Sequence, residues 1–157
     1  FNNPVFPNTR VQTTLAKQLA LYVVIYSPLQ MASDLPENYV GNPAFEFIDQ
    51  VPVEWSKSII VDGKIGDYVV TARKDKHSNN WFVGAITDEN ARKMMLSFDF
   101  LDKDKKYELI IYKDASDTDW KTNSTAVTIE KHEVDSNTFL ELQLAKGGGA
   151  ALYLREM

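Results

Sequence analysis

The pattern of hydrophobic and polar residues changes at Pro52. Beyond this residue, apolar and polar positions alternate in short runs separated by turn residues, a pattern typical of half-buried β-strands. The runs predict eight strands, at residues 55–61, 67–74, 81–87, 93–100, 107–113, 126–134, 138–144 and 150–155. Strands of this length at a spacing of about ten residues indicate an antiparallel β-sandwich or barrel, and we predict the sandwich.

The first 52 residues follow a helical pattern instead. We predict a helix over residues 11–26, ended by Pro28, in which residues 19–26 are all apolar or aromatic. A helix that is apolar on all sides needs neighbours all round, and we expect that a small sheet domain cannot supply them. A short alternating strand is predicted at residues 29–33, and a second helix at residues 43–49, with Pro43 at its first position.

The two patterns predict two units, residues 1–52 and an all-β domain of residues 53–157. The chain has 157 residues, 44% of them hydrophobic, which is enough for a substantial core. Its 22 acidic and 17 basic residues are mixed along the sequence, which argues against a nucleic-acid partner. The apolar run of about ten residues is short of the roughly twenty that cross a bilayer, so we expect no membrane partner.

Three acidic residues lie close together between Asp114 and Trp120. A calcium site needs six to eight oxygen ligands and usually a glycine for its sharp turn, and this stretch has no glycine. We therefore interpret it as a solvated hairpin loop. The histidines His77 and His132 have no further ligands near them in the sequence, so we predict no metal site in this chain.

Trp120 is the best candidate for contact with a sugar ring, because an exposed indole in a loop can stack on one. The alternative is that Trp120 packs over a sheet edge, as large aromatic side chains commonly do. The glycines at 147–149 are interpreted as a hairpin turn and not as a phosphate loop, because predicted strands lie on both sides of them.

Several long strings make the chain similar to a known family. They are residues 14–39, DQVPVEW (49–55), DGKIGDYVVTAR (62–73), WFVGAITDENAR (81–92) and GGGAALYL (147–154). Together they cover most of the chain and resemble the end of glycoside hydrolase family 97, the α-glucosidases and α-galactosidases. The resemblance implies an N-terminal β-sandwich, a central (β/α)₈ barrel and a C-terminal β-domain, with calcium in the active site of the parent enzyme.

On this resemblance, residues 1–52 are the last α/β elements of the catalytic barrel, and residues 53–157 are the C-terminal sandwich. The catalytic and calcium-binding residues of the family lie upstream, so no catalytic residue and no cofactor are predicted for this fragment. The family also implies a periplasmic location. Whether the parent is an inverting α-glucosidase or a retaining α-galactosidase depends on upstream positions.

A barrel strand at residues 29–33 would place Gln30, Ser33 and Asp34 at or near the sugar-binding mouth, because strand C-termini face the active site of such barrels. The alternative is that Asp34 only caps the following turn. Asp34 and Glu37 are close in sequence and do not form a recognisable pair of catalytic carboxylates.

The leading hypothesis is a non-catalytic β-domain that packs on the barrel of an α-glycosidase, so that the main partner is the rest of the parent enzyme. The alternative is a carbohydrate-binding module that uses Trp120 to bind an oligosaccharide. Because the first helix is so apolar, we also expect that an isolated fragment self-associates through residues 15–31.

Overall fold

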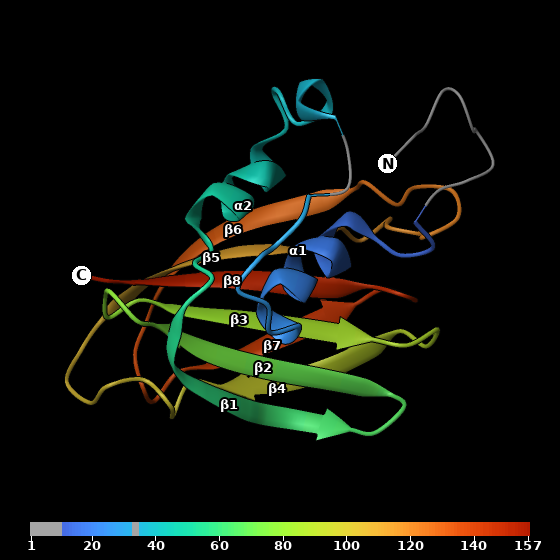
Figure 1. Cartoon of the computed structure of the whole chain (residues 1–157). Helices are drawn as coiled ribbons and strands as arrows, with labels where there is room; N and C mark the ends of the chain where they lie inside the picture. The colour runs from blue at the N-terminus through green and yellow to red at the C-terminus, as the bar shows by residue number, and fades with distance from the viewer. Residues whose placement is uncertain (1–10, 33–34) are drawn as a thin grey trace.

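The computed structural model describes residues 11–32 and 35–157, and its dominant elements are eight β-strands (Figure 1). The strands are β1 (Trp55–Lys64), β2 (Tyr68–Asp75), β3 (Trp81–Thr87), β4 (Arg92–Ser97), β5 (Tyr107–Asp114), β6 (Val127–Val134), β7 (Phe139–Leu144) and β8 (Gly149–Glu156). Each corresponds to one predicted strand, which confirms the mainly β fold class.

The strands form two sheets, and every pair of neighbouring strands is antiparallel. The large sheet has the order β1-β2-β3-β8-β5-β6, and the small sheet consists of β4 and β7. A core of alternating inward side chains, including the fully buried Trp81, Phe98 and Leu142, fills the space between the two sheets. This arrangement is the predicted sandwich.

The helical elements precede the strands. They are α1 (Leu15–Val24), the short 3₁₀ turns η1 (Pro36–Asn38) and η2 (Pro43–Phe45), and α2 (Glu46–Gln50). Helix α1 starts later than predicted because Thr14 caps it, accepting the Lys17 amide with its hydroxyl at 3.2 Å, and it ends at Val24, where Ile25 has an extended backbone. The strand predicted at 29–33 is wrong for residues 29–32, which have no strand structure, and Ser33 lies outside the described residues.

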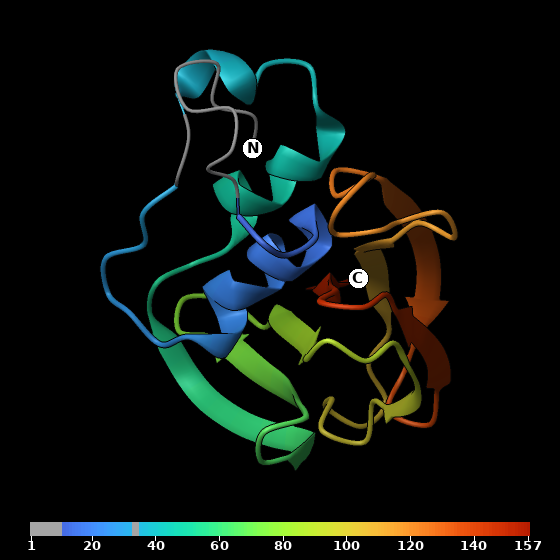
Figure 2. The same ribbon diagram turned by 90° about the vertical axis from the view of Figure 1, so that its right-hand side faces the viewer.

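Helix α1 lies on the outer face of the large sheet, over β3 and β8 (Figure 2). Leu15, Leu19 and Val23 are buried there in a second core. The helix approaches so closely that a Cβ at Gly84 would lie 2.5 Å from the Ala20 carbonyl oxygen. Our expectation that a sheet domain cannot cover this helix is therefore wrong for the side of the helix that faces the sheet. The small residues Ala20 and Gly84 allow the helix and the sheet to pack closely on that side.

The acidic stretch also differs from its interpretation as a wholly solvated loop. Asp114 is the last residue of β5 and only 7% exposed. Asp119 is in the loop, where its carboxylate accepts the amides of Lys121 and Thr122 at 2.8 and 2.9 Å. The run therefore divides into a buried strand end and a turn-forming surface residue.

Candidate functional site

The structure gives Gln30 a structural role at the end of α1. Its side-chain amide donates to the carbonyl oxygens of Tyr22 and Ile25, at 3.4 and 3.3 Å. Tyr22 lies in the last turn of the helix and Ile25 is its C-cap residue, and carbonyls at this end of a helix have no intrahelical donors. Ser33 and Asp34, the other residues of the predicted sugar-binding mouth, lie outside the described residues.

Trp120 lies in the loop between β5 and β6 and is half-buried. Its indole ring lies against Gly147, whose added Cβ would be 3.7 Å from the ring, and the Lys121 ammonium is 4.9 Å from the ring centroid. This loop and the segment that contains Gln30 lie on opposite sides of α1 (Figure 2). The fold therefore does not bring Gln30 and Trp120 together.

Within residues 11–32 and 35–157, no cluster of three or more His, Asp or Glu side chains is arranged to hold a metal ion. In the acidic loop, one oxygen of the Asp119 carboxylate accepts backbone amides of its own turn, and the loop brings together no such cluster. No helix in the same part of the chain is long and apolar enough to cross a membrane. The distinctive features of the described residues are the two charged side chains that join α1 to the sheet and the apolar surface beside α1.

Arg73 on β2 fastens the C-terminal end of α1. Its guanidinium donates to the Val23 carbonyl at 2.6 Å and to the Val24 carbonyl at 3.4 Å, and it also donates to the Ser58 hydroxyl at 2.7 Å. The side chain is 9% exposed, and burial lowers its pKa. A cation at a helix C-terminus also interacts favourably with the helix dipole.

Asp114 organises the opposite end of the helix. One oxygen of its carboxylate accepts the amides of Ala145 and Gly149, each at 2.9 Å, and so shapes the turn between β7 and β8. The carbonyl of Gly147 in this turn accepts the Thr14 amide at the start of α1, at 3.3 Å. Burial raises the pKa of Asp114. A turn is present at this point, but the prediction of a hairpin is wrong, because β7 pairs with β4 in the small sheet and β8 pairs with β3 and β5 in the large sheet. The turn crosses between the sheets and is also a contact for the helix.

Sequence reasoning missed both anchors. Arg73 is a charged residue within an alternating strand, in a position that faces away from the inner core of Val70 and Ala72. The alternation of the strand could have indicated which side of the sheet Arg73 faces. Nothing in the local sequence indicates that its partner lies 50 residues earlier in the chain. Asp114 is the last residue of an apolar strand. A charged residue at that strand end was the available signal of its structural role.

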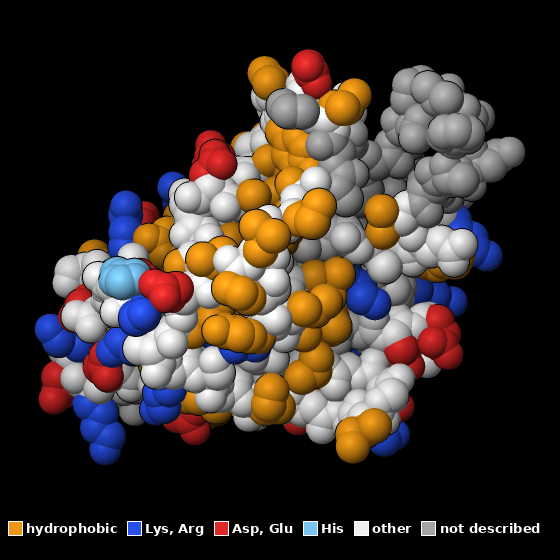
Figure 3. All heavy atoms as spheres, viewed as in Figure 1, with side chains coloured by type: hydrophobic (Ala, Val, Ile, Leu, Met, Phe, Trp, Pro, Cys, Tyr) orange, Lys and Arg blue, Asp and Glu red, His pale blue; other side chains and the backbone are white. Residues whose placement is uncertain are grey.

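A band of exposed hydrophobic side chains follows α1 along the chain. We call it the α1 patch; its members are Ile25, Tyr26, Leu29, Met31, Leu35 and Val40, each at least 55% exposed. In the space-filling view, hydrophobic side chains gather over α1 and the adjoining segments (Figure 3). A continuous apolar surface of this kind is typical of an interaction site.

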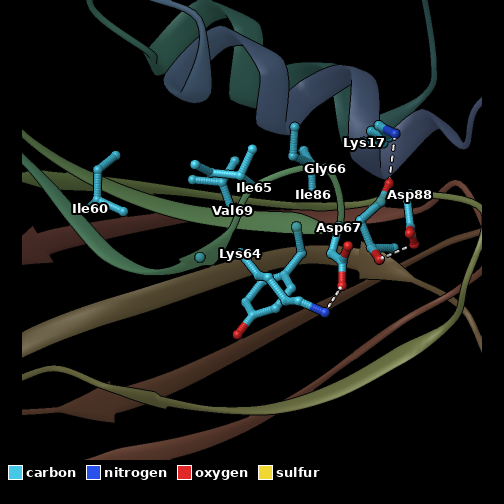
Figure 4. Close-up of a pocket in the computed structure, with 12 residues that line it drawn as sticks. Lys17, Ile60, Lys64, Ile65, Gly66, Asp67, Val69, Ile86 and Asp88 are labelled. Atoms are coloured by element: carbon cyan, nitrogen blue, oxygen red, sulfur yellow. Dashed lines mark hydrogen bonds and ion pairs between the residues drawn. The ribbon is translucent and has the colours of Figure 1, made fainter.

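A second apolar feature lies between α1 and the hairpin that joins β1 to β2. This β1–β2 pocket has a volume of about 480 Å³ and is lined by Lys17, Ile60, Gly63, Lys64, Ile65, Gly66, Asp67, Tyr68, Val69, Ile86, Thr87 and Asp88. Figure 4 shows the aliphatic side chains along the pocket, with Lys17, Asp67 and Asp88 together at one end.

The described residues form a two-layered antiparallel sandwich that carries a helix on the outer face of its large sheet and an exposed apolar surface beside that helix. The profile described as "Glycosyl-hydrolase 97 C-terminal, oligomerisation" matches residues 54–155. The chain therefore belongs to the C-terminal domain family of glycoside hydrolase family 97, as the resemblance indicated.

Individual relatives agree with this assignment. The chain is 37% identical, over 97% of its length, to a retaining alpha-galactosidase of Bacteroides thetaiotaomicron. Among solved structures, it is similar to a family 97 enzyme of Pseudoalteromonas in complex with panose, with 51% identity, 94% of this chain covered and a TM-score of 0.91. A beta-arabinopyranosidase structure matches with 26% identity, 92% of this chain covered and a TM-score of 0.71.

The chain is much shorter than these relatives. It spans 22% of the Bacteroides enzyme, 23% of the Pseudoalteromonas chain and 22% of the arabinopyranosidase chain. The similarity to the Pseudoalteromonas structure covers 94% of this chain.

Proposed function

We propose that this chain is the non-catalytic C-terminal end of a family 97 α-glycosidase, and that it packs against the catalytic part through the α1 patch. The observation that carries the proposal is the position of the apolar surface. Ile25, Tyr26, Leu29 and Met31 are exposed directly after a helix that the sheet holds firmly. Full burial of an exposed Ile, Leu or Met side chain contributes about 1.5 to 3 kcal/mol, and covering these partly buried side chains contributes a part of that.

The parent protein in this proposal hydrolyses α-linked oligosaccharides. The curated relative is a retaining alpha-galactosidase, while the Pseudoalteromonas enzyme was solved with panose, so both α-galactosidase and α-glucosidase activity fit. Calcium at the active site of the parent and export to the periplasm belong to the same proposal, and their support is the family relationship alone. Residues 1–52 are, on this view, the end of the catalytic barrel.

The test has two parts. The protein isolated from its source should have a mass of roughly 80 kDa, because the 17.8 kDa chain corresponds to 22% of the Bacteroides relative. The complete protein should hydrolyse p-nitrophenyl α-galactoside or α-glucoside with calcium present, whereas the 157-residue chain alone should not. Turnover by the purified 157-residue chain that persists after a second purification would contradict a non-catalytic role.

A further inference from the structure

The outer face of the large sheet is only partly covered by the helices of this chain. Helix α1 lies over β3 and β8, and α2 follows beside it, where Phe47 contacts Tyr112 of β5 with ring centroids 5.5 Å apart. The layer stops at β2, where Arg73 binds the end of α1. In the part of the chain that the structure describes, no helix covers the outer face of β1 (Figure 1, Figure 2).

The uncovered outer face is apolar at its end near the β1–β2 hairpin. Ile59 and Val61 point into the inner core, so the alternation of a strand places Ile60 on the outer face, where it is 65% exposed. Val69 of β2 lies on the same face, since Val70 is in the inner core. With Ile65 at the hairpin, fully exposed, these residues border the β1–β2 pocket (Figure 4).

The charged end of the pocket has few free groups for a polar ligand. Lys64 pairs with Asp67 at 2.7 Å, and Arg92 pairs with Asp88 at 3.1 Å. Lys17 donates to the carbonyl oxygen of Thr87 at 2.7 Å. Because these charges already have partners, the pocket favours an occupant that presents aliphatic side chains, and a volume of about 480 Å³ accommodates several of them.

We propose that the β1–β2 pocket is the seat of a third helix, an amphipathic segment of the parent protein from before this chain, which lies beside α1 and completes the helical layer on the sheet. The chain spans about a fifth of its relatives. In the proposed function it is the C-terminal end of a protein of that length, whose earlier part would supply the segment. Side chains at helical spacing on one face would fill the pocket between α1 and the hairpin. This inference rests on the proposed function and extends it to a second surface.

The test uses the absence of cysteine from this chain. Three single variants, Ile60→Cys, Met31→Cys and Met95→Cys, report on the pocket, on the α1 patch and on the outer side of the small sheet, and all three positions are at least 60% exposed here. Maleimide labelling rates are measured by mass spectrometry of the peptide that contains each position, in the 157-residue chain and in the complete parent protein.

We expect the Ile60→Cys thiol to react about tenfold or more slowly in the complete protein than in the 157-residue chain, because a packed neighbour blocks it. The Met95→Cys control should react equally fast in both. Slow labelling of Met31→Cys combined with unchanged labelling of Ile60→Cys would overturn this inference and leave the proposed function standing. Unchanged labelling at both positions would refute the proposed function itself.

The identity of the occupant is tested by a photo-crosslinker attached to an Ile65→Cys variant of the complete protein. The expected product is an intramolecular crosslink to one upstream peptide whose apolar residues repeat every three to four positions. A crosslink to a second copy of the protein, or to a peptide within residues 1–157, would overturn the inference. Protection of Ile60→Cys that rises with concentration in the 157-residue chain would also indicate a second copy.

Discussion

Replacement of Arg73 by methionine should detach the C-terminal end of α1 from the sheet. Methionine keeps most of the length of the side chain and its apolar stem. It removes the donors to the carbonyl of Val23 and to the hydroxyl of Ser58, at 2.6 and 2.7 Å. The contact of the guanidinium with the Tyr26 ring, 5.6 Å from its centroid, is lost as well.

The expected loss in the free energy of unfolding is about 3 kcal/mol. A hydrogen bond to a charged group contributes about 1.5 to 3 kcal/mol, and a buried carbonyl that loses its donor costs about 1 to 3 kcal/mol. For the two short hydrogen bonds we expect a loss near the lower end of these ranges. Water can enter beside the exposed side chain of Tyr26 and replace part of the lost hydrogen bonding. For a chain of this size, a change of that magnitude lowers the melting temperature by about 6 to 12 °C.

The measurement is urea unfolding of the 157-residue chain followed by tryptophan fluorescence, with hydrogen exchange to locate the change. Faster exchange should be concentrated at residues 21–25, the last turn of α1. Arg155→Met is the matched control, because Arg155 lies on the surface and pairs with Glu108, and exposed pairs contribute about 1 kcal/mol or less. Equal losses for the two variants, or a loss below 1 kcal/mol for Arg73→Met, would refute the reasoning.

Three further changes test the helix contacts and the sugar-binding alternative. Gly84→Val should destabilise the chain by about 2 kcal/mol or more, because a Cβ there would lie 2.5 Å from the Ala20 carbonyl oxygen; a thermal melt unchanged from wild type would contradict the close packing. Burial raises the folded-state pKa of Asp114 above 3.8, so its charge lowers stability at neutral pH and this penalty disappears as the pH falls through the raised pKa. The unfolding free energy of wild type minus that of Asp114→Asn should therefore increase from pH 7 toward pH 4, and a constant difference would show that Asp114 is not desolvated. Trp120→Ala should leave binding to maltooligosaccharides or galactooligosaccharides unchanged in calorimetry while lowering stability, because the indole packs on Gly147; lost sugar affinity at unchanged stability would instead support a carbohydrate-binding module.

Self-association of the isolated chain stays a prediction, but its surface is smaller than the sequence suggested. Leu15, Leu19 and Val23 are buried against the sheet, so they cannot contribute to an interface between copies. The exposed contribution comes from Ile25, Tyr26 and the residues that follow. Sedimentation equilibrium of the 157-residue chain would show whether this remaining area is enough.

The sequence by itself determined the strands, because the signal for a half-buried strand is local. Alternation from residue to residue places Val70 and Ala72 inward and Val69 and Arg73 outward, whatever the neighbouring strand is. The turn at Gly147, where φ is +62°, could also be predicted, because glycine tolerates this backbone conformation. The long matching strings identified the family for the same reason, since they are properties of the chain alone.

Only the tertiary structure decided how these elements meet. That β8 lies between β3 and β5 and that β4 pairs with β7 depends on contacts between distant segments. Composition alone describes the first helix as apolar all round, but the fold shows which side is buried: the side that approaches Gly84. The roles of Arg73 and Asp114 were hidden for the same physical reason. A charged side chain is stable in a buried position only when donors or acceptors converge on it, and here those groups come from backbone 50 residues before Arg73 and 31 to 35 residues after Asp114.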